Sequence, residues 1–297
     1  MVVRCWWVEA GGAMRLLRDT RWLAVGLALV LLGGMCLRAG AQASALPSAQ
    51  IGAANGDAGK GRALLDAMVA ALGGQAWLDR KTWMFAGRTA TFYKGEPKGV
   101  APEFEEYGRV RPFGERVVMV SHYGAVVAKD HRDVAEVWTS ESGYEVTYKG
   151  VTPLPAKDVA EFARWRGHSV DVVTEWVKQP GVVVTYAGSK MVERSLADEV
   201  SVLSAGDDAV TLDLDAVTHL PLSVSFRWRD PVFKDWNTEV QEFADYHAVQ
   251  GIMTPYSMTT MHNGDITAEK FLTKVVYNVP LAAELFDPGQ RLPKKGK

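Results

Sequence analysis

Apolar and polar residues alternate along most of the second half of the chain, which is the pattern of half-buried strands in an antiparallel sheet. The clearest example is the segment 220–229, in which every second residue is apolar. Asn263 and Gly264 separate two such segments, and both residues tolerate the positive φ of a tight hairpin turn. Residues 207–279 therefore predict a run of antiparallel strands joined by short turns.

Strand patterns also cover much of the remaining chain. The predicted strands are residues 83–93, 104–110, 116–129, 135–139, 144–148, 181–186, 198–203, 209–214, 220–229, 238–246, 252–262 and 267–277. Short connections make neighbours in sequence neighbours in the sheet. Since about ten strands is near the limit for an open twisted sheet, we expect this sheet to curl strongly or to close.

Two segments place apolar residues at helical spacing. Residues 60–80 predict a first helix, with Asp57 as its N-cap and Gly73-Gly74 as a break near its end. Residues 156–178 predict a second helix, with two shorter helices as the alternative because Gly167 interrupts the pattern. Both apolar stripes need cover, and the concave face of a curled sheet supplies it. The chain therefore predicts an α+β fold with helices across the concave face of a strongly curved antiparallel sheet.

The N-terminus has the pattern of an export signal. Three arginines between residues 15 and 21 precede a short apolar stretch at 22–32, and Ala41-Gln42-Ala43 supplies a cleavage pattern. We therefore expect residues 1–43 to be a signal peptide of an exported, periplasmic protein; an uncleaved anchor is the weaker alternative, and Met14 is an alternative start codon.

Three further segments follow the predicted signal peptide. Residues 44–56 are rich in Ala, Ser, Gly and Gln and predict a flexible linker. Residues 57–288 predict a single β-rich domain, because no change of composition divides them. Residues 289–297 predict a basic tail.

Cysteine usage limits the chemistry that is open to the chain. Cys5 and Cys36 are the only cysteines, and both precede the predicted cleavage site. The mature chain would therefore have no disulfide, no thiolate nucleophile and no cysteine metal ligand. Gly33-Gly34-Met35-Cys36 resembles a lipobox, although Met35 is bulky for its position. A membrane-anchored form lipidated at Cys36 is the alternative to an unlipidated periplasmic form.

Composition indicates a folded domain that does not bind nucleic acid. Of the 297 residues, 47% are hydrophobic and 23% are charged, and the formal net charge is −2. Removal of residues 1–43 would take away five basic and two acidic residues, which changes the charge to −5. A mildly acidic chain is a poor candidate for a nucleic-acid partner.

The sequence contains no compact catalytic, cofactor or metal motif. The six histidines lack the paired spacing of metal ligands, and the segment 56–61 lacks both the first glycine and the Ser or Thr of a phosphate-binding loop. Glu103, Glu105 and Glu106 are interpreted as the solvated part of a strand. We therefore predict no cofactor, no metal site, no catalytic residue and no enzymatic activity.

A series of short signals follows a specific order along residues 60–288. The matching stretches are Tyr186-Ala187-Gly188, Leu212-Asp213-Leu214-Asp215, Thr218-His219-Leu220-Pro221, Phe243-Ala244-Asp245-Tyr246, Gly251-Ile252-Met253-Thr254-Pro255, and Tyr277-Asn278 followed by Leu285-Phe286-Asp287. Their order resembles the LolA/LolB-like superfamily of periplasmic lipoprotein carriers, in particular its outer-membrane lipoprotein-sorting-like members. Residues 107–112 and 142–143 match more loosely.

The resemblance implies an unclosed half-barrel with helices across its concave face and an apolar cavity that accepts acyl chains. Such a protein acts without catalysis, because burying methylene groups provides about 0.8 kcal/mol each. We therefore predict an exported carrier whose partners are lipid or lipoprotein acyl chains. The alternative is a periplasmic sensor of the same fold that binds an envelope membrane protein.

Eleven apolar residues are the predicted walls of this cavity. They are Leu64, Met68 and Leu72 from the first helix, with Leu222, Val224, Phe226, Trp228, Tyr256, Met258, Phe271 and Val275 from the strands. The alternative is that these residues fill a dry core, since alternating apolar residues usually do.

Overall fold

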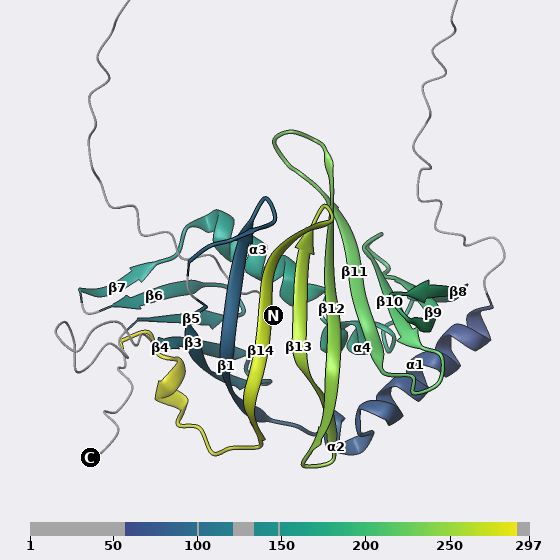
Figure 1. The fold of residues 1–297 in the computed structure, drawn as a ribbon, viewed down its shortest axis with the longest axis horizontal. Helices are drawn as coiled ribbons and strands as arrows, with labels where there is room; N and C mark the ends of the chain where they lie inside the picture. The colour runs from purple at the N-terminus through teal and green to yellow at the C-terminus, as the bar shows by residue number, and fades with distance from the viewer. Residues whose placement is uncertain (1–56, 100, 121–133, 148, 290–297) are drawn as a thin grey trace, which may run out of the picture. The chain divides into compact units, whose positions relative to one another are not determined.

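The chain forms one continuous antiparallel sheet in the part that the computed structural model describes, residues 57–99, 101–120, 134–147 and 149–289 (Figure 1). This part contains fourteen strands. Their bounds are β1 (Thr82–Tyr93), β2 (Glu96–Pro97), β3 (Glu103–Arg109), β4 (Gly114–Val120), β5 (Ala135–Thr139), β6 (Gly143–Thr147), β7 (Gly150–Pro153), β8 (Val183–Val192), β9 (Ser195–Leu203), β10 (Ala209–Asp215), β11 (Pro221–Arg229), β12 (Trp236–Val249), β13 (Ile252–His262) and β14 (Asp265–Tyr277).

The order of the strands shows how the two halves of the chain meet. It runs β7-β6-β5-β4-β3-β1-β14-β13-β12-β11-β10-β9-β8, with β2 paired to β1. The long-range pair β1–β14, in which Phe85 lies opposite Val275, joins the two series of hairpins in the middle of the sheet. From this centre the strands change direction towards β6 on one side and β8 on the other (Figure 1). The predicted fold class, an α+β fold with a curved, unclosed antiparallel sheet, is confirmed.

The helices are α1 (Ala58–Leu72), α2 (Gln75–Leu78), α3 (Ala156–Gly167) and α4 (Val170–Trp176), with the 3₁₀ turn η2 (Ala283–Phe286) near the C-terminus. Asp57 caps α1 by accepting a hydrogen bond from the Lys60 N–H at 2.8 Å, as predicted. Gly73, at φ 124°, ends the helix. Gly73 and Gly74 therefore end the first helix. Residues 156–176 form two shorter helices, which is the alternative given above for the second predicted helix.

Close backbone packing of α1 against β8 depends on Gly61. A Cβ atom at this position would lie 2.9 Å from the Tyr186 nitrogen, so a larger residue would separate helix and strand. The apolar side of α1 then joins the main core with Leu64, Met68 and Leu72. Gly61, the last residue of the segment compared above with a phosphate-binding loop, therefore allows α1 to pack closely on β8.

Helix α3 spans the concave side of the sheet and contacts strands that lie far apart in it. Phe162 stacks on Trp138 of β5 with 4.2 Å between ring centroids. Trp165, one turn along the same helix, packs edge-on against Phe226 of β11 at 5.1 Å. Six strands separate β5 from β11 in the sheet. One short helix therefore connects the two arms of the half-barrel (Figure 1).

Strand β11 departs from simple alternation at Leu222. Pro221 lies opposite Leu214 and Ser223 lies opposite Asp213, which leaves Leu222 as the extra residue of a β-bulge. A bulge reverses the faces on either side of it, so Pro221 and Val224 are buried while Leu222 is half-buried. The expectation that Leu222 shares one face with Val224 is therefore wrong.

Two other expectations also need correction. The predicted strand 181–186 ends too early, because β8 continues through Gly188 to Val192, with a shift of pairing between Tyr186 and Gly188. The alternation missed β7 and β2, which are short edge elements. The predicted signal peptide, linker and lipobox, residues 121–129 of a predicted strand, and nearly all of the basic tail lie outside the described residues.

Glu106 is buried, contrary to the interpretation of Glu103, Glu105 and Glu106 as the solvated part of a strand. Its side chain is fully buried, and one carboxylate oxygen lies 2.6 Å from the Lys270 Nζ. The other oxygen accepts a hydrogen bond from the Trp83 indole at 2.8 Å. Burial lowers the Lys270 pKa well below its usual value. The adjacent Glu106 carboxylate opposes this effect, because an opposite charge at 2.6 Å favours the charged amine. The two side chains therefore form a buried ion pair beneath the sheet's central strands.

We expect Glu106→Gln to lower the free energy of unfolding by about 3–5 kcal/mol, because it leaves the buried Lys270 ammonium without its carboxylate. Equilibrium urea denaturation measures this change. The matched control is Glu105→Gln, on the opposite face of the same strand, which should cost less than about 1 kcal/mol. Equal losses in the two variants would contradict the assignment.

Candidate functional site

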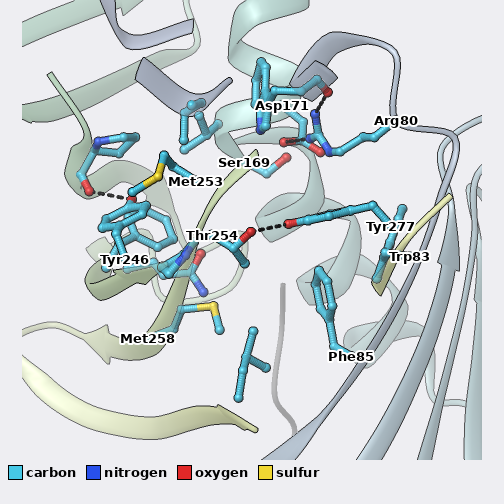
Figure 2. Close-up of a pocket in the computed structure, with 18 of the residues that line it drawn as sticks. Arg80, Trp83, Phe85, Ser169, Asp171, Tyr246, Met253, Thr254, Met258 and Tyr277 are labelled. Atoms are coloured by element: carbon cyan, nitrogen blue, oxygen red, sulfur yellow. Dashed lines mark hydrogen bonds and ion pairs between the residues drawn. The ribbon is translucent and has the colours of Figure 1, made fainter. Parts of the chain in front are cut away.

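A cavity of about 200 Å³ lies on the concave side of the sheet, between the central strands and helices α3 and α4 (Figure 2). Its sheet wall comes from β1, β12, β13 and β14, and its end wall comes from the α1–α2 corner, through Leu72 and Trp77. The cavity therefore brings together segments from opposite ends of the domain's sequence.

Apolar side chains, many of them aromatic rings and methionines, form most of the cavity wall. Trp83 and Phe85 share a face of β1, and Phe85 meets the Tyr277 ring edge-on at 5.8 Å. Space for the Trp83 indole comes from Gly108 on β3, where a Cβ atom would overlap the ring. Met253 and Met258 line the opposite side (Figure 2). Methionine adapts to irregular apolar partners, so this wall is suited to flexible apolar ligands.

The two tyrosines in the wall turn their hydroxyl groups to protein partners. The Tyr246 hydroxyl donates to the Pro221 carbonyl at 2.7 Å, and the Tyr277 hydroxyl is 2.9 Å from the Thr254 hydroxyl. Burial raises the pKa of both tyrosines. Both side chains are therefore neutral at physiological pH and contribute mainly their rings to the cavity.

An ion pair closes one end of the cavity. Arg80, between α2 and β1, pairs with Asp171 at the start of α4 (Figure 2). The Arg80 guanidinium also lies 4.3 Å from the Trp77 ring and donates to the Trp77 carbonyl. These contacts fix α4 to the α2–β1 connection. Both charges already have partners, so this end has little hydrogen-bonding capacity left for a ligand.

Glu115 adds a polar group of a different kind to the cavity wall. Its side chain lines the cavity, the residue is 4% exposed, and its Oε1 has no hydrogen-bond partner among the described residues. Burial raises the Glu115 pKa, and the nearby Arg166 guanidinium opposes part of this shift. Arg166 itself lies 4.1 Å from the Phe113 ring. This carboxyl group can therefore offer a hydrogen bond to a polar group of a ligand.

No protein-family model matches the sequence, and no curated protein sequence matches it. Several solved structures are similar. A DUF1329-family protein from Desulfovibrio piger has a TM-score of 0.53 at 11% identity, over 76% of this chain and 96% of that one. A domain from Vibrio parahaemolyticus described as an outer-membrane lipoprotein-sorting protein has a TM-score of 0.50 at 10% identity, over 78% and 97% of the respective chains. The chain has a LolA-like fold.

A LolA-superfamily protein from Nitrosomonas europaea is also found, with a TM-score of 0.48 at 8% identity, over 76% of this chain and 96% of that chain. The resemblance seen in the order of sequence signals is thus confirmed as a likeness of fold by the two structures with higher scores. At identities near 10%, the likeness extends to the fold alone.

The predicted wall residues are spread over several parts of this LolA-like fold. Leu72 and Met258 line the cavity. Leu64, Met68, Val224, Phe226 and Val275 are buried in the main core, and Trp228 and Tyr256 are half-buried against it. Leu222 is the half-buried bulge residue. Phe271 is 45% exposed and lies outside the cavity. Ligand binding by these eleven residues stays a prediction.

The sequence did not reveal Phe243 and Tyr246 as wall residues, because they are three residues apart on β12 and both line the cavity. Ala244 pairs with Ser257 and Tyr246 pairs with Pro255, so the register is the same on both sides of Asp245, whose φ is 55°. Strict alternation would have placed Phe243 on one face with Asp245 instead of Tyr246. For Trp83 and Phe85 the signal was present, because both occur in alternation on a predicted strand.

Other kinds of site were sought in the same part of the chain. Among the described residues, no group of three His, Cys, Asp or Glu side chains is placed to hold a metal ion. Within those residues, no helix combines the length and the apolar character that crossing a membrane requires.

We expect Glu115→Gln to raise the free energy of unfolding by about 1–3 kcal/mol at pH 7.5, because it removes a buried charge. A raised folded-state pKa means that the contribution of Glu115 to stability is present below about pH 4.3 and is lost as the pH rises through the folded-state value. The difference between the variant and the parent should therefore shrink at pH 4. Urea denaturation at the two pH values measures it.

Glu141→Gln, in the exposed turn between β5 and β6, is the matched control and should change stability little at either pH. A Glu115→Gln variant that is less stable than the parent at pH 7.5 would contradict the buried, unpartnered carboxyl.

Proposed function

We propose that this protein is an exported carrier that holds lipid acyl chains, free or attached to a lipoprotein, in the cavity between its curved sheet and its helices. One observation carries the proposal: the cavity wall is built largely from apolar side chains, including Trp83, Phe85, Met253 and Met258. Burying a flexible hydrocarbon against such a wall is favourable, whatever head group the hydrocarbon carries.

Simple energetics agree with reversible carriage. Ten buried methylenes would contribute about 8 kcal/mol, which corresponds to about micromolar affinity before the costs of association are subtracted. A chain bound at this strength can be delivered to a stronger acceptor. The cavity of about 200 Å³ is smaller than the roughly 300–1,000 Å³ that is usual for small-molecule sites. Uptake of a whole acyl chain would therefore require the helices to move.

The helix cover is suited to such a movement. Helix α4 is seven residues long, and its N-terminal end is fixed to the α2–β1 connection by the Arg80–Asp171 ion pair. The Asp171 side chain is 45% exposed, so this ion pair contributes little to stability and can open at small cost. We infer that α4 is the part of the cover that moves when a ligand enters.

Binding is favoured over catalysis by the state of the polar groups. The two tyrosine hydroxyls and Arg80 already have protein partners. The similar Vibrio parahaemolyticus domain is described as lipoprotein-sorting, which supports a carrier role. The expected signal peptide supports a periplasmic location.

Leu272→Trp should weaken binding of a fluorescent fatty acid at least tenfold, because Leu272 lines the cavity and the larger ring would occupy it. The matched control is Phe271→Trp, the adjacent residue on the outer face of β14, which should bind as the parent does. Probe titration of the three proteins measures the affinities, and urea denaturation checks that each is folded.

Failure of the parent protein to take up the probe would contradict the proposal, as would equal affinity in the two tryptophan variants. A protein that takes up no lipid but co-purifies with a stoichiometric envelope membrane protein would favour the sensor alternative.

A further inference from the structure

The connection between β11 and β12, residues 230–235, extends beyond the edge of the sheet as a long hairpin (Figure 1). It exposes large apolar side chains. Val232 is 75% exposed and Phe233 is 78% exposed, and Trp236 at its base is 58% exposed. Turns usually contain Gly, Asn, Asp, Ser or Pro, so a Val-Phe pair at the tip is not explained by turn formation.

Hydrogen bonds hold the turn in one shape. The Asp230 carboxylate accepts from the Val232 and Phe233 N–H groups at 2.7 and 2.8 Å, which lowers the Asp230 pKa. The Lys234 N–H donates to the Asp230 carbonyl at 3.0 Å, and the Arg229 Nε donates to the Lys234 carbonyl at 2.9 Å. The backbone of the tip is therefore fixed with Val232 and Phe233 outside the fold, which limits the entropy that binding would cost.

A second aromatic residue lies on the same edge of the sheet, by which we mean the edge formed by the ends of the central strands. The start of β12, the end of β13, the start of β14 and the end of β1 share this edge, because these strands are successive antiparallel neighbours. Tyr93 at the end of β1 is 60% exposed. The Lys94 and Lys98 ammonium groups lie 5.5 and 4.8 Å from its ring centroid. The edge thus combines the exposed apolar side chains of the hairpin with an aromatic ring that has lysine side chains beside it.

Basic side chains also flank the hairpin. The Arg227 guanidinium lies 5.0 Å from the Trp236 ring, and Arg229 and Lys234 belong to the hairpin itself. Asp235, Glu96 and Asp265 lie on the same edge, and the Asp230 carboxylate is turned to its own backbone. Apolar tips below a belt of Trp, Tyr, Arg and Lys are the arrangement that proteins use at a membrane interface.

We propose that this edge, with Val232 and Phe233 at its tip and Trp236 and Tyr93 behind them, docks on the surface of a phospholipid bilayer that contains anionic lipids. Burying two apolar side chains is enough for weak, reversible attachment to a bilayer, whereas a stable protein interface buries more than about 1,000 Å² and needs a shaped partner. The basic flanks complement anionic head groups. The proposal does not depend on what occupies the cavity.

The test is sedimentation of the exported protein with vesicles of phosphatidylethanolamine and phosphatidylglycerol. We expect the double variant Val232→Ser, Phe233→Ser to lower partitioning at least tenfold. The matched control is Val217→Ser, because Val217 is 86% exposed in the turn at the opposite end of β11. Partitioning of this control should equal that of the parent. Both sites are exposed, so unchanged urea denaturation will show that the variants are folded.

Equal partitioning of the parent and the double variant would overturn the proposal, as would an equal loss in the Val217→Ser control. Binding of the parent should also be weaker on vesicles of phosphatidylcholine alone and at 0.5 M salt. If binding is unchanged in both conditions, the basic flanks do not contribute to it. The docking variants should keep the parent's affinity for the fluorescent fatty acid, and Leu272→Trp should keep vesicle binding. Failure of docking is therefore distinguishable from failure of the carrier function.

Discussion

The structure depends on how the concave face of a fourteen-stranded sheet is kept from water. Joining β1 to β14 produces a sheet that curves strongly, and its inner face is largely apolar. Helix α3 covers the middle of this face by resting Phe162 on one arm and Trp165 on the other. Together with α4 it is too short to fill the whole hollow, and the space that remains is the cavity. The candidate site is thus a consequence of the fold's geometry and needs no specialised motif.

Polar groups on the concave side are placed so that the hollow stays apolar. The Glu106–Lys270 pair links β3 to β14 and leaves neither charge unpaired in the interior. The Arg80–Asp171 pair joins α4 to the segment that precedes β1. Glu115 differs, since one of its oxygens is buried without a hydrogen-bond partner among the described residues. A buried unpartnered carboxyl costs stability, and under the proposed function Glu115 would receive a polar part of the ligand.

Local signals in the sequence predicted the elements well, and long-range geometry explains what they missed. Gly73 ends α1 and Asn263-Gly264 forms its turn, because both depend on backbone conformations that few residues adopt. Alternation could not show the bulge at Leu222, which exchanges the faces of β11, or the positive φ of Asp245 in β12. Nor could it show that β1 lies beside β14, the pairing that brings Phe85 to Tyr277. The fold was therefore predictable, whereas only Leu72 and Met258 of the predicted residues line the cavity.

Under the two proposals, the cavity would hold an acyl chain and the apolar edge would bring the protein to the bilayer that contains such chains. The central claim is that the hollow beneath α3 and α4 holds lipid. Native mass spectrometry of the protein purified from the cells that express it, followed by extraction and identification of the released lipid, tests this claim most directly. The account predicts a population whose added mass equals an acyl lipid that organic solvent removes. A mass of the polypeptide alone, together with no uptake of added fatty acid, would contradict it.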